Sequence, residues 1–261
     1  SMFLHHCLEA GLTSVIINVK HIIPINKISQ EDQDICNNLI FNKGEEPLFK
    51  FIAHFSDKEA IDTAVEDEEY LKMSDEEKIA QIASKFEDIM TILGLDLNDD
   101  SLRGTPLRVA KMYVSEAFAG LNPKNKPEMK LFDNKYQYRD MLIEKNITVH
   151  SHCEHHFVPI IGKAHIAYIS TGKVIGLSKL NRIVQYYAKR PQVQERLTNQ
   201  IAEELKIILG TDSVAVIIDA KHLCVSSRGI KDDTSATVTS FYGGAFNTTA
   251  KIAELQNYLK L

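Results

Sequence analysis

Two short clusters of cysteine and histidine, far apart in the sequence, place the strongest constraint on how this chain can fold. The first runs from Ser151 to His156 with the sequence SHCEHH, and the second is His222-Leu223-Cys224. Each cluster stands beside an apolar run that is typical of a strand. If both clusters bind one metal ion, the fold must bring these two distant segments together.

The residue types and their spacing predict a catalytic zinc site. Cys153 and His156 form a C-x-x-H pair, and Cys224 is the expected third ligand. Three N/S ligands without an obvious fourth are typical of a zinc site that keeps one position for water. Thiolate and imidazole donors favour zinc over magnesium or calcium. The alternative is an accidental spacing, with the histidines as ordinary surface or core residues.

Strand geometry adds two expectations about this site. Because side chains alternate along a strand, Cys153 and His156 can face one ion only if the chain turns between them. We expect the second strand to extend to Val225, which puts His222 and Cys224 on one face. His222 would then lie beside the metal without binding it, and His155 would be its counterpart in the first cluster.

Composition is that of a globular chain with an ordinary core. With 261 residues, 44% of them hydrophobic, the chain can form one large or two small domains. No apolar run approaches the roughly 20 residues that cross a bilayer, and no signal peptide pattern is present, so we expect no membrane partner. The formal charge of -5 disfavours non-specific nucleic-acid binding but allows a local basic pocket. Four scattered cysteines do not make a disulfide framework, which fits a cytoplasmic protein.

The N-terminal part differs in character from the rest of the chain. Residues 1–70 are expected to form an extension of uncertain fold, with a buried strand at Ser14–Val19 and a helix at Glu31–Ile40. The acidic stretch at 57–77 is typical of a solvated linker or an exposed helix face. The main domain is therefore expected at 71–261.

The same N-terminal part has a resemblance of its own. The pattern FLHHCLEAGLTSVIINVKHIIPI, followed by NNLIFN, resembles the last strand-helix units of the methyltetrahydrofolate-binding domain of cobalamin-dependent methionine synthase. The pattern covers only the end of what would be a complete barrel, and an incomplete barrel has no pterin pocket. We therefore assign the segment no activity, and do not assign His5 and His6 as metal ligands.

In the main domain, the order of periodic segments predicts an antiparallel α+β fold. Ser74 and Glu77 form a capping box that begins a helix, and Thr105-Pro106 begins a second helix that ends at Gly120. The region 122–138 is expected to be a loop. Strands and helices then follow as two strands, two helices, two strands and a tail helix. Their ranges are 143–151 and 158–169, 178–189 and 193–209, 214–225 and 235–241, and 248–259.

A basic cluster opens the helix predicted at 178–189. Ser178 stands at its start, where free backbone N–H groups and the helix dipole favour an anion. Lys179 and Arg182 are three residues apart and lie near one another on the helix surface. Arg228 adds a bidentate donor suited to phosphate oxygens. These residues predict a polyphosphate pocket near the metal, and the simpler alternative is a solvated basic helix face.

Gln194 and Glu195 open the next predicted helix. A carboxylate at a helix start is favourable for the helix dipole alone. A fixed carboxylate could also accept hydrogen bonds from the N1 and 2-amino groups of a guanine ring. These residues alone do not decide between the two roles.

Several uncommon blocks, taken together, resemble one enzyme family. They are SHCEHHFVPIIGKAHIAYI, GLSKLNRIVQYYAKRPQVQERLT and HLCVSSRGIKDDTSATVTS, preceded by TPLRVAKMY in the helical part. In this order and spacing they resemble GTP cyclohydrolase I over residues 76–246. His152 and the pair Ser226-Ser227 stand at positions where that family varies.

The resemblance implies a zinc-dependent hydrolase that converts GTP and water to 7,8-dihydroneopterin triphosphate and formate, the first step of tetrahydrofolate and pterin biosynthesis. Zinc lowers the pKa of bound water to roughly 7, and the resulting hydroxide would add to C8 of the guanine. His222 would deliver a proton to N7, and His155 would position or shuttle protons. The remaining roles carried over are zinc binding by Cys153, His156 and Cys224, ring opening by Ser178, guanine binding by Glu195 with Gln194, and triphosphate binding by Lys179, Arg182 and Arg228.

The family also implies an architecture. Its tunnelling fold, or T-fold, joins the sheets of neighbouring subunits into a barrel, and two pentamers stack as a homodecamer whose active sites are shared between subunits. For this chain we expect an α+β T-fold with an antiparallel four-stranded sheet, two helices between the strand pairs and preceding N-terminal helices. The helical part would span 74–121 and the T-fold part 141–246.

Two other functions stay open at this stage. A non-catalytic zinc-binding scaffold would keep the fold without turnover, although the expected acid, guanine and phosphate residues are all present. Another T-fold enzyme, such as a pterin synthase or a nitrile reductase of the queuosine pathway, would use other ligands or a cysteine nucleophile. Here both cysteines of the domain are assigned to the metal.

Overall fold

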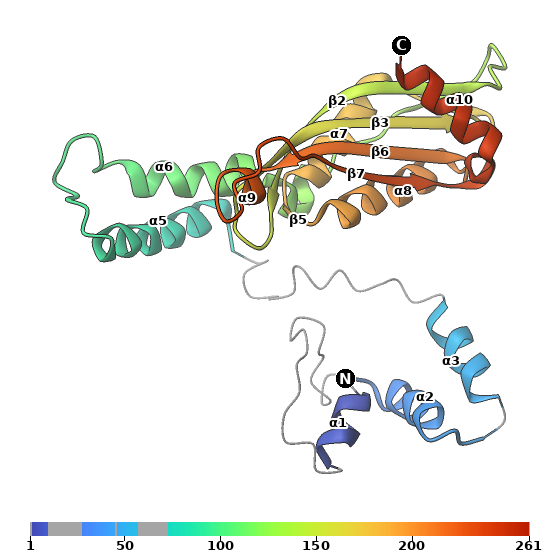
Figure 1. Cartoon of the computed structure of the whole chain (residues 1–261), viewed down its shortest axis with the longest axis horizontal. Helices are drawn as coiled ribbons and strands as arrows, with labels where there is room; N and C mark the ends of the chain where they lie inside the picture. Colours follow the sequence, from blue (N-terminus) through green and yellow to red (C-terminus); the bar gives the residue numbers. More distant parts are fainter. Residues whose placement is uncertain (1, 10–27, 45, 57–72, 261) are drawn as a thin grey trace. The chain divides into compact units, whose positions relative to one another are not determined.

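The computed structural model describes residues 2–9, 28–44, 46–56 and 73–260 (Figure 1). The chain divides into two compact units, Ser1–Glu68 and Glu69–Leu261. The strand expected at Ser14–Val19 lies outside the described residues, and so does most of the linker expected at 57–77.

The described part of the first unit is helical. It contains α1 (Met2–Glu9), α2 (Gln30–Ile40) and α3 (Pro47–Ser56). Helix α2 confirms the helix predicted at 31–40, and the Ser29 hydroxyl caps it by accepting from the Asp32 N–H at 3.1 Å. Helix α3 is tied to α2 where His54 Nε2 lies 2.6 Å from Asp32 Oδ1.

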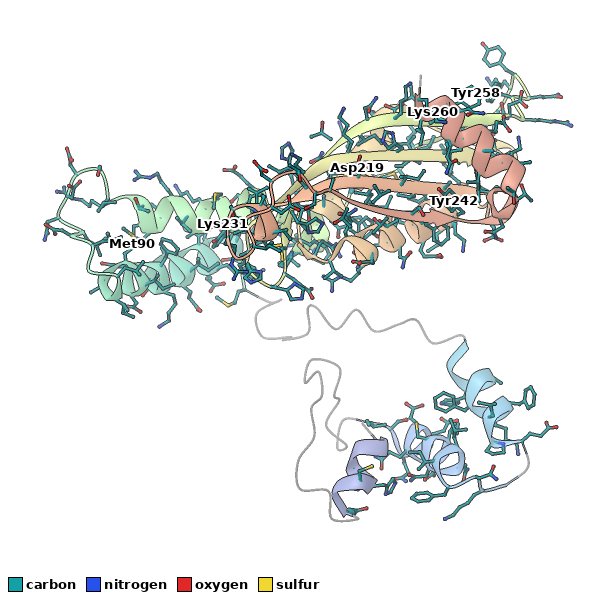
Figure 2. All side chains as sticks on the ribbon, viewed as in Figure 1. Met90, Asp219, Lys231, Tyr242, Tyr258 and Lys260 are labelled. Carbon is teal, nitrogen blue, oxygen red and sulfur yellow. The ribbon has the colours of Figure 1, made fainter. Side chains whose placement is uncertain are left out.

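The second unit opens with a pair of helices, α5 (Asp75–Ile92) and α6 (Thr105–Met112), which pack on each other. The predicted capping box at the start of α5 is confirmed, and Met90 is the buried residue of that helix (Figure 2). Helix α6 is shorter than predicted, because the chain continues as η3 (Tyr113–Ala117), η4 (Ala119–Leu121) and η5 (Pro123–Asn125).

Close packing fixes the position of Gly120, inside η4, against the end of the helix at 177–188. The N–H of Gly120 donates to the Lys189 carbonyl at 2.9 Å. A Cβ at Gly120 would lie 2.0 Å from the Tyr186 carbonyl oxygen, so only glycine permits this approach of two backbones.

A mixed sheet of five strands forms the centre of the second unit. The strands β2 (Met141–Cys153), β3 (Pro159–Ile169), β6 (Val214–His222) and β7 (Thr237–Tyr242) pair antiparallel in that order. The two-residue strand β5 (Pro191–Gln192) adds a parallel edge beside β2. The sequence analysis expected four antiparallel strands and missed β5, which is too short to show a periodicity.

A second, two-stranded sheet was also missed. It pairs β1 (Leu131–Asp133) with β4 (Lys173–Ile175), within the region predicted as a loop and just before the predicted helix at 178–189. Each strand has three residues, so neither shows the alternation on which the prediction of strands depends.

Helices cover both faces of the large sheet, but unequally. The helices α7 (Leu177–Ala188) and α8 (Gln194–Leu209) lie along one face and bury the main core, while α10 (Thr249–Lys260) crosses part of the other face (Figure 1). The fully buried core includes Val149, Ile160, Ile166, Tyr168, Leu180, Leu197, Ile201 and Ile218. Asp219 stands exposed on β6 (Figure 2). Among the described residues, the structure contains no helix with the length and apolar character needed to cross a bilayer.

Candidate metal centre

A tight turn at the end of β2 presents the first cluster. Cys153 is the last residue of the strand, and its N–H donates to the Val158 carbonyl at 2.9 Å while its carbonyl accepts from the Phe157 N–H at 2.8 Å. Phe157 has a φ of 55°, which the turn requires. The predicted change of direction between Cys153 and His156 is confirmed.

The structure brings the three predicted ligands together. The ligand atoms of Cys153, His156 and Cys224 all lie within 4.8 Å of one another. The Cys153 sulfur is 3.9 Å from His156 Nδ1 and 3.6 Å from Nδ1 of the neighbouring His155. Burial, and a hydrogen bond that the Cys224 thiol donates to the Cys153 sulfur, raise the pKa of Cys224. Two thiols and one imidazole converging on a point fit zinc, because a cation would stabilise both thiolates.

The second cluster differs from its prediction. Strand β6 ends at His222 and does not extend to Val225, and Cys224 lies in the one-turn helix α9 (Leu223–Ser226). Strand alternation is therefore not what places Cys224 near the metal position. The helical turn α9 places Cys224 near the metal position. This turn begins directly after the last residue pair of β3 and β6, Ile160 and His222.

His222 is held in place by a buried amide. Its Nε2 lies 2.7 Å from Oε1 of Gln194, a residue that is 1% exposed. The Gln194 Nε2 donates to the carbonyls of Ile218 and Thr237 at 3.0 and 2.8 Å, which fixes which end of the amide faces the histidine. Burial lowers the pKa of His222, and the nearby Glu195 carboxylate opposes that shift.

Glu154, inside the metal-binding turn, is clamped by Arg196. The Arg196 Nη2 donates to Glu154 Oε2 at 2.7 Å and to the Pro191 carbonyl at 2.8 Å, and its Nε donates to Gln192 Oε1 at 2.9 Å. The Glu154 N–H also donates to the Gln192 carbonyl at 3.0 Å. The turn is thereby anchored to β5 and to the first turn of α8. This clamp was not predicted, because Glu154 and Arg196 are distant in the sequence and no motif links them.

Two of the predicted substrate residues lie beside the cluster. Arg228 is exposed and its Nη1 lies 2.9 Å from His156 Nε2. Glu195 is exposed in the first turn of α8, close enough to His222 to act on its pKa. Gln194 differs from both, because its side chain is buried and bonded to the sheet and to His222.

Ser178 and Lys179, two further predicted site residues, lie away from the metal cluster within one chain. Ser178 and Lys179 are at the start of α7, whereas the end of α7 at Ala188 leads into β5 beside the cluster. At 1.5 Å per residue, the helix separates Ser178 from Ala188 by about 15 Å. The Lys179 ammonium donates to the Glu128 carbonyl at 2.6 Å. Within one chain, therefore, Lys179 does not join Arg228 in a pocket.

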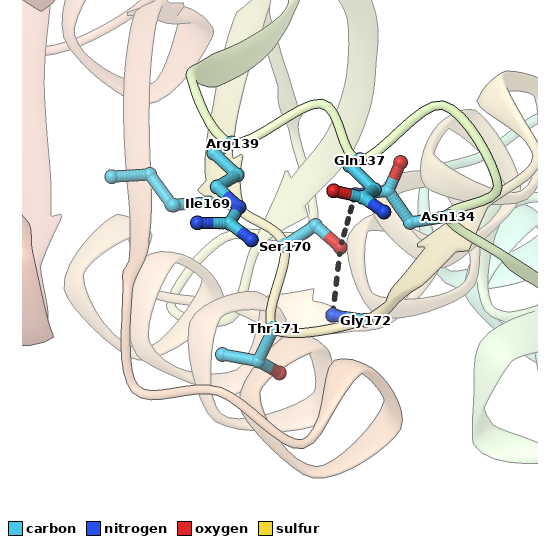
Figure 3. A pocket seen from close by; sticks show the side chains of 7 residues that line it. All are labelled: Asn134, Gln137, Arg139, Ile169, Ser170, Thr171 and Gly172. Carbon is cyan, nitrogen blue, oxygen red and sulfur yellow. Dashed lines mark hydrogen bonds between the residues drawn. The ribbon is translucent and has the colours of Figure 1, made fainter.

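Arg182 lies between these two ends, exposed on α7. It borders a hollow of about 410 Å³ together with Gln185, Lys189 and Asn125. A separate hollow of about 470 Å³ lies at the far end of the sheet, where β2 begins (Figure 3). Its lining residues are Asn134, Gln137, Arg139, Ile169, Ser170, Thr171 and Gly172, and none of the predicted site residues is among them.

Comparison with known proteins points to one family. The family model for GTP cyclohydrolase I matches residues 82–259. The chain is 61% identical to GTP cyclohydrolase 1 of Flavobacterium johnsoniae over 194 residues, which cover 74% of this chain and 87% of that protein. It is 54% identical to GTP cyclohydrolase 1 of Salmonella arizonae over 178 residues, covering 68% of this chain and 80% of that protein.

Proposed function

This chain belongs to the GTP cyclohydrolase I family, and from that premise we propose that it is a zinc-dependent enzyme that converts GTP and water to 7,8-dihydroneopterin triphosphate and formate. The observation that carries the proposal is the convergence of Cys153, His156 and Cys224. The product would enter tetrahydrofolate or pterin biosynthesis. None of the four cysteines, all of them among the described residues, forms a disulfide bond, which supports a reducing, cytoplasmic compartment.

Cys153, His156 and Cys224 would hold the zinc ion. When bound, zinc would supply a water molecule whose pKa is lowered to roughly 7, available for attack on C8 of the guanine. The Arg196 clamp on Glu154 keeps the turn that carries two of the ligands in one conformation. If His156 Nδ1 binds the ion, Nε2 carries the proton and ceases to accept from Arg228. The guanidinium is then free to bind an anion.

His222 would deliver the proton that N7 needs when C8 is attacked. Because Nε2 is engaged with Gln194 Oε1, the proton leaves from Nδ1. His155, with Nδ1 next to the Cys153 sulfur, would position or shuttle protons on the other side. Gln194, predicted as a substrate residue, acts in this proposal by orienting His222.

Glu195 would accept hydrogen bonds from N1 and the 2-amino group of the guanine. Its position in the first turn of α8, exposed and close to His222, supports this role. Arg228, Arg182 and Lys179 would bind the triphosphate, and Ser178 would assist ring opening.

The separation of these residues supports a site shared between subunits. Ser178 and Lys179 lie at the opposite end of α7 from the metal cluster, so one chain does not complete the site. We propose a T-fold homodecamer, two stacked pentamers, in which a neighbouring subunit supplies Ser178, Lys179 and Arg182. The uncovered part of the sheet and the helix pair α5–α6 offer surface for such assembly.

Complementation between two inactive variants tests both the activity and the sharing of the site. Cys224→Ala should abolish release of formate from GTP, and so should Lys179→Ala. Co-expressing the two variants should restore about one quarter of wild-type activity, because one quarter of the shared sites receive both intact halves. Inactivity of the wild-type protein toward GTP would refute the function, whereas an inactive mixture would refute only the sharing.

A further inference from the structure

A second cluster of metal-binding side chains lies in the N-terminal unit, on helix α1. His5, His6 and Glu9 each offer one nitrogen or oxygen atom, and these atoms lie within 4.8 Å of one another. None of these three residues belongs to the Cys153 cluster, and the proposed activity uses none of them. These histidines were not predicted as metal ligands, because the N-terminal segment resembles only a fragment of a barrel and was assigned no activity.

Glu9 lies between the two imidazoles. Its Oε1 is 3.4 Å from His5 Nε2, and its Oε2 is 3.2 Å from His6 Nδ1. The helix produces this arrangement, because residues three and four positions apart are neighbours on its surface. Ligands bound about 2.0–2.1 Å from a tetrahedral ion lie about 3.4 Å from one another. The two separations, 3.4 and 3.2 Å, lie close to that value.

The ring of His6 is oriented by the neighbouring helix. Its Nε2 lies 2.7 Å from Oδ1 of Asn37 in α2. An amide oxygen only accepts, so with Asn37 in this orientation Nε2 carries a proton, and in a neutral His6 the lone pair of Nδ1 faces Glu9. A lone pair and a carboxylate then face each other at 3.2 Å, and a cation between them would stabilise both. Histidines that bind metals are commonly held by such a hydrogen bond on the far nitrogen.

We propose that His5 Nε2, His6 Nδ1 and the Glu9 carboxylate form a binding site for a divalent transition metal. Two imidazoles and a carboxylate suit zinc, cobalt or nickel better than magnesium or calcium. The side chains are 38%, 24% and 61% exposed, so ions reach the site from solvent and water completes the coordination. A metal-free alternative is a protonated histidine paired with Glu9, and the experiment separates the two.

Cobalt(II) titration of the full-length protein tests the proposal. The wild-type protein should bind two ions per chain, one with the intense charge-transfer absorption of a thiolate ligand and one without it. Glu9→Gln should lose the second ion and keep the first, with unchanged turnover of GTP. Asn37→Ala should lower the affinity for the second ion by about 10–100-fold, because loss of a hydrogen-bond partner of a metal-binding histidine costs that much affinity.

His54→Gln is the matched control, because His54 lies in the same unit but pairs with Asp32. It should keep both ions. His5→Gln provides an independent second variant, and circular dichroism establishes that each variant retains its helices. Binding of a single ion by the wild-type protein, or retention of the second ion by both Glu9→Gln and His5→Gln, would overturn the proposal.

Discussion

Replacing the Arg196 guanidinium with an apolar group should both loosen the metal-binding turn and destabilise the fold. In Arg196→Met the Glu154 carboxylate loses its 2.7 Å partner, and the buried Gln192 loses the donor to its Oε1. Breaking a buried ion pair by removing one partner costs about 3–5 kcal/mol, and an exposed pair contributes about 0–1 kcal/mol. The Arg196 and Glu154 side chains are 28% and 19% exposed. We therefore expect a loss of about 2–4 kcal/mol in the free energy of unfolding, below the fully buried limit.

Urea denaturation of the apoprotein measures this loss, and competition with a zinc chelator measures metal affinity. Lys206→Met on the same helix is the matched control. Lys206 pairs with Glu203 at 3.1 Å, but Glu203 is 54% exposed, so the loss should be under about 1 kcal/mol. Affinity for zinc should fall in Arg196→Met and stay unchanged in Lys206→Met. The reasoning is refuted if the two variants have equal stability and equal affinity for zinc.

Three further predictions concern the metal, the pH dependence and the packing of the sheet. Cys153→Ala should abolish GTP turnover and roughly halve the thiolate absorption of bound cobalt, because Cys224 stays as a thiolate donor, and urea denaturation should show that the fold persists. Burial lowers the pKa of His165 below its ordinary 6.5. The unfolded chain therefore binds the proton more readily, so the free energy of unfolding is highest above about pH 6.5 and falls as the pH drops toward the lowered pKa. His165→Asn should make that fall shallower in urea midpoints measured at about pH 7.5 and 5.5. Gly162→Ala should cost about 1–3 kcal/mol, because its Cβ would lie 2.1 Å from the Asp219 carbonyl oxygen. A Gly162→Ala protein with the same free energy of unfolding as the wild type would contradict the close approach of β3 and β6 at Gly162.

The metal ligands could be predicted because their chemistry is local and specific. Cys153 and His156 are close in sequence, and strand geometry alone required the turn that the structure confirms between them. Cys224 could be predicted as the third ligand because it stands in the second cluster of cysteine and histidine, His222-Leu223-Cys224. The main helices and long strands were also predictable, because each is long enough to show its period.

The remaining features depend on contacts that no periodicity encodes. The expectation that Cys224 lies on a strand was wrong, because the sheet ends at His222 and the chain turns into a short helix. Strand β5 has two residues, and only its pairing with Cys153 reveals it. The clamp from Arg196 to Glu154 joins residues that are distant in sequence. All three features are set by tertiary packing.

The position of the basic residues has the same origin. Lys179 and Arg228 were grouped into one pocket because both are suited to phosphate. A residue type does not report distance, and the length of α7 separates Ser178 and Lys179 from the metal cluster. If the proposed sharing of the site holds, their grouping belongs to the oligomer and not to the single chain.

X-ray absorption at the zinc edge, on protein loaded with one equivalent of zinc, tests the central claim most directly. Coordination by Cys153, His156 and Cys224 predicts two sulfur atoms at about 2.3 Å and lighter atoms at about 2.0–2.1 Å. The sulfur shell should halve in Cys224→Ala. A spectrum with only nitrogen and oxygen neighbours in the wild-type protein would contradict the account.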